Sequence, residues 1–204
     1  MENEGPSAGR RPLKSRTTRW AALLTRAALA SGISANGMSV LGVLVSILGA
    51  AAILFAQERL WLFALAALAI QLRLLANMLD GLIAVEGGRG SPTGPIFNEF
   101  PDRIEDSLFL VAAGYACGLS WLGWLAALLA ATCAYVRLLG GTLGFKQDFG
   151  GPMAKPHRMA ALTLGCLVAI LWLPALQTTL AVIAAGTALT IVLRLARMAR
   201  ALKR

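Results

Sequence analysis

The chain has 204 residues, of which 57% are hydrophobic and 14% charged, and its net charge is +9. This composition is too apolar for an ordinary soluble domain of this length, so most of the chain is expected to lie in lipid. The basic residues flank apolar segments instead of lining a polar module. We therefore expect anionic membrane lipids as their partners and no nucleic acid.

Two segments precede the first long apolar stretch. Residues 1–13 are polar, contain Pro and Gly, and are predicted to form a disordered tail. Residues 14–30 combine Arg with Trp and Leu, which fits either an amphipathic helix in the membrane interface or a simple positive anchor. Because Arg26 interrupts the apolar stretch, no cleaved signal sequence is expected.

Six apolar stretches follow, each close to the length that crosses a bilayer core as a helix. We predict spans near residues 38–57, 60–82, 99–118, 120–139, 158–175 and 179–197. The predicted fold class is therefore all-α, a polytopic membrane protein with six transmembrane helices and an N-terminal interfacial helix. Residues 14–204 are expected to form a single membrane domain.

The distribution of Lys and Arg predicts the orientation of this domain. Basic clusters precede the first span, lie between the fourth and fifth spans, and close the chain. An even number of spans puts all three clusters on one side, which the positive-inside rule assigns to the cytoplasm. Both termini are thus predicted to be cytoplasmic, and the short links near residues 58, 119 and 176 to face outward.

Three carboxylates lie at the predicted cytoplasmic ends of the second and third spans: Asp80, Asp102 and Asp106. Ionisable residues at membrane depth are rare and usually functional. Asp102 and Asp106 share one helical face, and Asn77 shares another with Asp80. Crowded carboxylates repel each other unless a cation neutralises them, and Mg²⁺ or Mn²⁺ prefers such oxygen ligands. The four residues are therefore predicted to form a metal site.

The run from Asn77 to Val85, followed by Asp102 and Asp106, resembles the signature of the CDP-alcohol phosphatidyltransferases. That signature reads D-x-x-D-G-x-x-A-R, then a spacer, then G-x-x-x-D-x-x-x-D. Residues 33–39, with the sequence ISANGMS, also resemble the family's entry to its first span. The resemblance covers most of the chain and implies a six-helix membrane domain with a cytoplasmic interfacial helix.

The chain departs from this signature at several positions. Asn77 stands at the first Asp, Val85 at the Arg and Asn98 at the Gly of the second half, and the spacer is longer. An amide at position 77 keeps an oxygen but lacks the charge, so metal binding is expected to be weaker. Arg89, in the glycine-rich segment 86–94, either replaces the signature Arg or belongs to a flexible connection.

The resemblance implies transfer of a phosphatidyl or related phospho group from a CDP-linked lipid, such as CDP-diacylglycerol, to a small polar alcohol. CMP is released, and the reaction belongs to phospholipid biosynthesis at the cell membrane, with the active site on the cytoplasmic face. Two Mg²⁺ or Mn²⁺ ions and a homodimer are implied as well. The implied ligands are Asn77, Asp80, Asp102 and Asp106, with Asp106 as general base, and Gly81, Ala84 and Arg89 border the donor.

Lys155 and Arg158 lie at the start of the fifth span, three residues apart. They are expected to bind the phosphate of an acceptor or head group, as basic residues do in some family members. The alternative is that they only anchor the span on its cytoplasmic side.

Other interpretations of the acidic residues remain open. Asp102 can instead pair with Arg73 or Arg103 at the surface. The departures at Asn77 and Val85 also fit a family member that has lost catalysis and binds lipid or nucleotide. A small transporter is a third alternative, although such proteins tend to have polar breaks at the bilayer midplane and repeated halves.

Overall fold

The computed structural model describes residues 18–85, 87–88 and 90–203. Within these residues the protein consists of seven α-helices and contains no strand, which confirms the all-helical prediction. The helices are α1 (Arg19–Ala30), α2 (Ala35–Phe55), α3 (Leu62–Val85), α4 (Gly94–Ala116), α5 (Ser120–Thr142), α6 (Lys155–Ala169) and α7 (Pro174–Leu202). The predicted tail 1–13 and Arg89 lie outside the described residues.

Each of the six predicted spans corresponds to one helix, from α2 to α7. Four of them, α2, α3, α5 and α7, are long and apolar enough to cross a membrane. Helix α6 has only 15 residues, and α4 has charged residues in its first half. The structure is thus that of a polytopic membrane protein, and the count of six spans stays a prediction.

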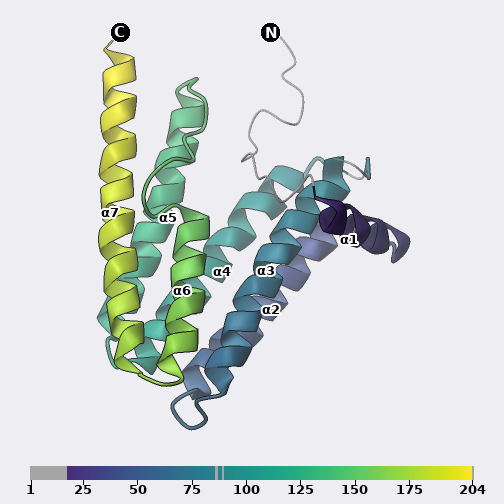
Figure 1. The fold of residues 1–204 in the computed structure, drawn as a ribbon. Coiled ribbons are helices and arrows are strands. Elements are labelled where there is room, and N and C mark those ends of the chain that lie inside the picture. The colour runs from purple at the N-terminus through teal and green to yellow at the C-terminus, as the bar shows by residue number, and fades with distance from the viewer. Residues whose placement is uncertain (1–17, 86, 89, 204) are drawn as a thin grey trace.

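Helices α2 to α7 pack in a ring whose order differs from the order of the chain (Figure 1). Helix α2 packs against α3 and α4, α4 against α5, α5 against α7, α7 against α6, and α6 against α3. Small residues allow close helix approach. At the α4–α5 contact, a Cβ atom on Gly114 would lie only 2.7 Å from the Cα atom of Gly123.

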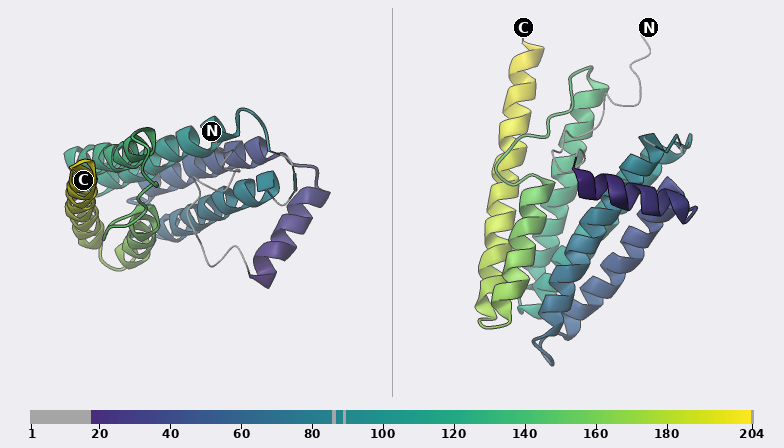
Figure 2. Two further views of the ribbon diagram at one scale, coloured as in Figure 1. Left: turned by 90° about the horizontal axis from the view of Figure 1, so that it is seen from above. Right: turned by 45° about the vertical axis from the view of Figure 1, so that its right-hand side comes forward.

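Helix α1 runs across the direction of the other helices (Figures 1 and 2). It packs on α3 through a face that includes the buried Ala21, Thr25 and Ala28. Its opposite face exposes Trp20 and Leu23. An exposed apolar face on a helix in this orientation supports the predicted interfacial role.

The two ends of the bundle differ in polarity. The turns α2–α3, α4–α5 and α6–α7 lie at the end opposite the C-terminus (Figure 1), and four exposed tryptophans lie in or beside them. These are Trp61, Trp121, Trp124 and Trp172. Tryptophan is typical of membrane interfaces. Of the buried charged residues that the structure describes, Asp80, Arg158 and Arg194 lie toward the other end. Arg73, Glu105 and Asp106 lie near the middle of α3 and α4.

Candidate active site

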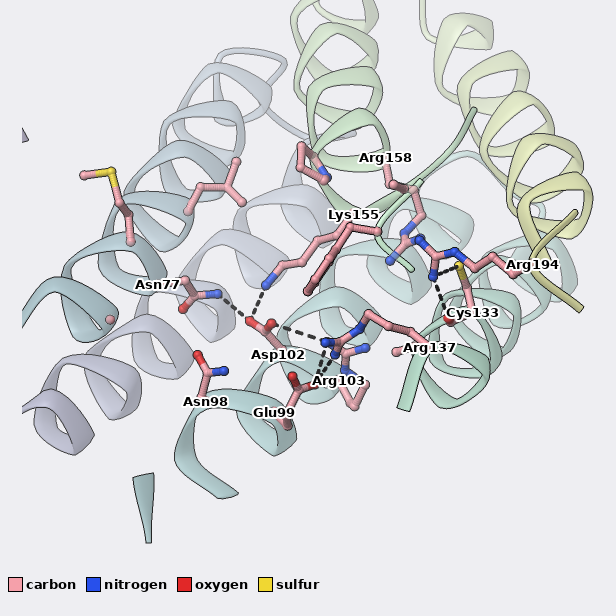
Figure 3. A pocket seen from close by; sticks show the side chains of 17 residues that line it. Asn77, Asn98, Glu99, Asp102, Arg103, Cys133, Arg137, Lys155, Arg158 and Arg194 are labelled. Carbon is pink, nitrogen blue, oxygen red and sulfur yellow. Dashed lines mark hydrogen bonds and ion pairs between the residues drawn. The ribbon is translucent and has the colours of Figure 1, made fainter. Parts of the chain in front are cut away.

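The predicted site residues come from the last turns of α3 and the first turns of α4 and α6. Helix α4 begins at Gly94 and α6 at Lys155, and each has a proline in its first turn, where proline needs no hydrogen-bond partner for a backbone N–H. Asn98 and Asp102 therefore lie one and two turns into α4. Asn77 and Lys155 approach Asp102 from α3 and α6 (Figure 3).

The carboxylate of Asp102 is the centre of this arrangement. Its Oδ1 atom accepts a hydrogen bond from Nδ2 of Asn77 at 2.5 Å and forms an ion pair with the ammonium group of Lys155. Nη2 of Arg73 lies 3.7 Å from the same oxygen, and Nη2 of Arg103 lies 3.3 Å from Oδ2. Asp102 thus interacts with residues of α3, α4 and α6, and its side chain stays 17% exposed.

Behind Asp102 lies a buried network of two arginines and two carboxylates. Arg73 forms ion pairs with Glu105 through Nε and with Asp106 through Nη2, the latter at 2.5 Å. Arg158 completes the network, with Nη2 at 3.1 Å from Oδ2 of Asp106. All four side chains are at most 3% exposed. Asp106 is thus held by guanidinium groups on both carboxylate oxygens.

This network corrects one alternative from the sequence. Arg73 does pair with the acidic residues, but in the protein interior and not at the surface. Glu105 was missed as a site residue, although Nδ2 of Asn77 donates to its Oε2 atom at 3.1 Å. Its position three residues after Asp102, on the same helical face, was the available signal.

Asp80 lies apart from these ion pairs. Its side chain is buried, and its Oδ2 atom accepts a hydrogen bond from the hydroxyl of Ser39 on α2 at 2.8 Å. Among the residues that the structure describes, no hydrogen-bond partner is found for its Oδ1 atom. Asp80 therefore has one buried carboxylate oxygen available for a ligand.

A pocket of about 180 Å³ opens beside Asp102. Asn77, Gly81 and Asn98 line it together with Asp102, whereas Asp80 and Asp106 are not among its lining residues. Of the residues predicted to border the donor, Gly81 lines the pocket and Ala84 packs instead in the apolar cluster beneath α1. Val85 is the exposed last residue of α3.

Basic side chains form another part of the pocket wall. Lys155 and Arg158, which were predicted, line it together with Arg137 and Arg194, which were missed. Nη1 of Arg194 donates to the carbonyl of Cys133 at 2.9 Å, and Nη2 of Arg137 lies 2.5 Å from Glu99. Both missed residues are charges inside long apolar helices, which was the signal available in the sequence.

Lys155 lies between the acidic and basic parts of the pocket. Its ammonium group pairs with Asp102, and its side chain stays 23% exposed. An ammonium group between the acidic and basic parts of the pocket can bind either a carboxylate of the protein or a phosphate of a ligand.

The fit of a divalent ion to this site rests on one carboxylate and two amides. Within the described part of the chain, no group of three or more His, Cys, Asp or Glu side chains is arranged to hold a metal ion. The free buried Oδ1 atom of Asp80 and the amide oxygens of Asn77 and Asn98 are nevertheless hard donors, of the kind that Mg²⁺ and Mn²⁺ prefer. The donor set therefore fits a divalent ion.

Comparison with known proteins identifies the family. No family model matches the chain. The chain is 28% identical over 191 residues to the phosphatidylinositol phosphate synthase of Mycobacterium tuberculosis, covering 84% of this chain and 82% of the relative. It is 33% identical over 141 residues to the archaetidylinositol phosphate synthase of Aeropyrum pernix, covering 67% of this chain and 71% of the relative.

Solved structures show the same fold. The crystal structure of the M. tuberculosis phosphatidylinositol phosphate synthase with CDP-DAG bound matches with a TM-score of 0.76 and 24% identity, over 89% of this chain and 94% of that one. The same synthase in complex with manganese and citrate matches with a TM-score of 0.74 and 24% identity, over 86% and 87% of the two chains. The 33% identity to the A. pernix synthase, over 71% of that relative, shows that the chain belongs to the CDP-alcohol phosphatidyltransferase family.

Proposed function

We propose that this protein is a membrane transferase that moves a phosphatidyl group from CDP-diacylglycerol to an alcohol that carries a phosphate. The observation that carries this proposal is the pocket itself, where Asp102 lies between polar residues of α3 and the basic residues of α6 and α7. The relatives named as phosphatidylinositol phosphate and archaetidylinositol phosphate synthases support the reaction class.

The donor is proposed to bind at the α3 and α4 side of the pocket. Gly81 has no side chain, so a nucleotide can approach the backbone of α3 there. Asp80 with the side-chain oxygens of Asn77 and Asn98 is proposed to hold a divalent ion, and an ion bound there supplies positive charge for the pyrophosphate and the departing CMP. The manganese bound to the M. tuberculosis synthase supports a metal of this kind.

The acceptor is proposed to bind at the basic side. Lys155, Arg137 and Arg194 converge on the pocket from three helices, and a phosphate on the acceptor would satisfy their charge. Arg158 is expected to contribute less to binding of the acceptor phosphate, since its guanidinium already contacts Asp106 and donates to the carbonyl of Met153 at 3.1 Å. An acceptor phosphate here would direct the alcohol toward Asp102.

Asp102 is a better candidate for the general base than Asp106. It lines the pocket and is partly exposed, whereas Asp106 is buried and ion-paired on both oxygens. In the proposed step, Asp102 takes the proton of the acceptor hydroxyl as that oxygen forms a bond to the phosphorus bearing the lipid. The bond from this phosphorus to the bridging oxygen breaks, and CMP leaves with that oxygen.

The location is proposed to be the cytoplasmic membrane, with both termini and the pocket on the cytoplasmic side. Basic residues near the pocket end and exposed tryptophans at the other end support this orientation. Lipid-linked donors would then reach the pocket from the bilayer with their nucleotide in the cytoplasm. A homodimer is part of the proposal on the strength of the family resemblance.

The reaction is tested with the purified protein in nanodiscs, using labelled CDP-diacylglycerol, Mn²⁺ or Mg²⁺, and a panel of phosphorylated and plain alcohols. The proposal expects CMP release and a new labelled lipid with a phosphorylated acceptor. Asp102→Asn is expected to abolish both, while Asp148→Asn, which changes an exposed carboxylate paired with Arg197, is the matched control. Absence of CMP release with every acceptor would overturn the proposal.

A second candidate function is binding without turnover. The observation that favours it is the hydrogen bond from the Asn77 amide to Asp102, which occupies both groups with each other. This alternative expects saturable binding of CDP-diacylglycerol with no CMP release. The same nanodiscs distinguish the two functions by comparing a binding isotherm with the release assay.

A further inference from the structure

When the second half of the family signature, G-x-x-x-D-x-x-x-D, is aligned on Asp102 and Asp106, Asn98 stands at its glycine. The same pattern fits the chain better when it is moved four positions toward the N-terminus. Gly94 then takes the glycine position, Asn98 the first acidic position and Asp102 the second. The spacer after Val85 becomes shorter by the same four residues. The pocket agrees with this register, because Asn98 and Asp102 line it and Asp106 does not.

In this register, amides replace carboxylates at two of the four acidic positions. Asn77 on α3 and Asn98 on α4 border the same space beside Asp102 (Figure 3). The whole chain has only four asparagines, so half of them lie at this pocket. Asp80 and Asp102 are the two carboxylates that remain.

The charge left at these four positions is too small for two divalent ions, and Glu99, a further carboxylate that lines the pocket, is paired with Arg137. Four carboxylates neutralise two such ions, whereas two carboxylates neutralise one. The protein's own cations already interact with Asp102, since Lys155 pairs with Oδ1 and Arg73 lies 3.7 Å from the same atom. A second divalent ion at Asp102 would therefore meet an ammonium and a guanidinium group with little negative charge between them.

We propose that the site binds a single divalent ion per chain, and that the ammonium group of Lys155 occupies the position beside Asp102 where a second ion would bind. The ion's proposed ligands are Asp80 and the side-chain oxygens of Asn77 and Asn98. Oδ1 of Asp80, on a side chain that is 6% exposed and without a partner for this atom in the described residues, is the oxygen expected to bind it. The inference rests on the proposed function for the presence of a metal.

The test is a Mn²⁺ titration of the full-length protein in nanodiscs with CDP-diacylglycerol, followed by electron paramagnetic resonance. The expected result is one bound Mn²⁺ per chain with the spectrum of an isolated ion. Two bound ions per chain, with the coupling typical of a pair about 3.5–4 Å apart, would overturn the inference. No bound ion would overturn it as well.

Variants at positions 77 and 98 test the inference by the number of Mn²⁺ ions bound, without a measurement of activity. The double variant Asn77→Asp with Asn98→Asp restores both carboxylates and is expected to bind a second Mn²⁺. Asn36→Asp is the matched control, because Asn36 lies outside the pocket and bonds Ser91 and Thr93, and it is expected to keep one ion. A double variant that folds by circular dichroism but still binds one ion would contradict the inference.

CMP release measured on the same samples separates this inference from the proposed function. Two bound ions with CMP release would reject the single-ion site and leave the transferase standing. One bound ion without CMP release, for any acceptor, would leave the single-ion site standing and reject the transferase.

Discussion

Nη2 of Arg73 lies 2.5 Å from Oδ1 of Asp106, and both side chains are almost fully buried. Removing one member of a buried ion pair leaves the other charge uncompensated in a medium that solvates it poorly. Arg73→Met and Asp106→Asn are therefore each expected to lower the free energy of unfolding by roughly 3 kcal/mol. Unfolding in detergent, followed by tryptophan fluorescence, measures this loss.

The double variant Arg73→Met with Asp106→Asn is the control for this pair. It is expected to lose less stability than the sum of the single variants, because no charge is left unpaired at this contact. Strict additivity would mean that the two residues do not interact in the folded protein. Arg103→Met, whose side chain is 25% exposed, is expected to change stability much less.

Gly42 of α2 is expected to be intolerant of any side chain. A Cβ atom at this position would lie 2.7 Å from Oε1 of Glu105 and 3.3 Å from Oδ1 of Asn77. Gly42→Ala must displace these buried groups and is expected to cost about 1–3 kcal/mol of stability. The same substitution should also lower CMP release, since Asn77 contacts Asp102 directly.

Gly141→Ala is the matched control for Gly42→Ala. Gly141 is also helical, but an added Cβ would meet only Gln147 at an ordinary distance of 3.6 Å. It is expected to keep activity and to keep or slightly gain stability, because alanine has a higher helix propensity than glycine. Equal losses in both variants would show that the contact with Glu105 is not the cause.

The helices were predictable from the sequence because long apolar segments in lipid have few alternatives to helical structure. Each of the six predicted spans is matched by a helix between α2 and α7. The order of their packing was not predictable, since it depends on three-dimensional contacts such as that between Gly114 and Gly123. Hydropathy also gave no reason to separate α6, which has only 15 residues, from the longer helices.

The site was predictable only in part. Helical spacing correctly associated Asn77 with α3 and Asp102 with α4, and the pocket brings them together. Spacing within one helix does not say which side of it is buried, and so Asp106 appeared equivalent to Asp102. Arg137 and Arg194 were not predicted as site residues for another reason. They reach the pocket from α5 and α7, which are far from the acidic motif in sequence.

Lys155→Met is expected to weaken binding of the phosphorylated acceptor more than binding of the donor. Loss of one charged hydrogen bond to phosphate is expected to raise the acceptor KM roughly tenfold. The donor KM should change much less, since Lys155 lies on the basic side of the pocket. Lys146→Met removes an exposed lysine outside this pocket and is the matched control, with both KM values unchanged.

The orientation of the bundle is tested by the accessibility of single cysteines in intact cells and inverted vesicles. Cysteines at positions 148 and 203 are expected to react only from the cytoplasmic side, and those at 58, 119 and 176 only from the outside. The reason is the positive-inside rule, since basic residues cluster at one end of the bundle. Labelling of positions 148 and 176 from the same side would show that α6 does not cross the membrane and would reject the count of six spans.

Asn77 is expected to couple the stability of the protein to metal binding. Nδ2 of Asn77 donates to Asp102 at 2.5 Å and to Glu105 at 3.1 Å, so the amide holds two carboxylates near each other. Asn77→Asp removes this donor and adds a third negative charge at the same point. Without a metal the variant is expected to be less stable than the natural protein, because like charges in a partly desolvated site repel.

Mn²⁺ reverses that expectation, because a carboxylate at position 77 is a charged ligand for the ion, and binding neutralises the added charge. The melting temperature of Asn77→Asp should therefore rise more on addition of Mn²⁺ than that of the natural protein. Asn77→Ala removes the donor without adding charge, and it is expected to lose stability that Mn²⁺ does not restore. If Mn²⁺ shifts the melting of Asn77→Asp and Asn77→Ala equally, the side chain at position 77 does not contact the ion, and the ligand set proposed here must be drawn from other residues.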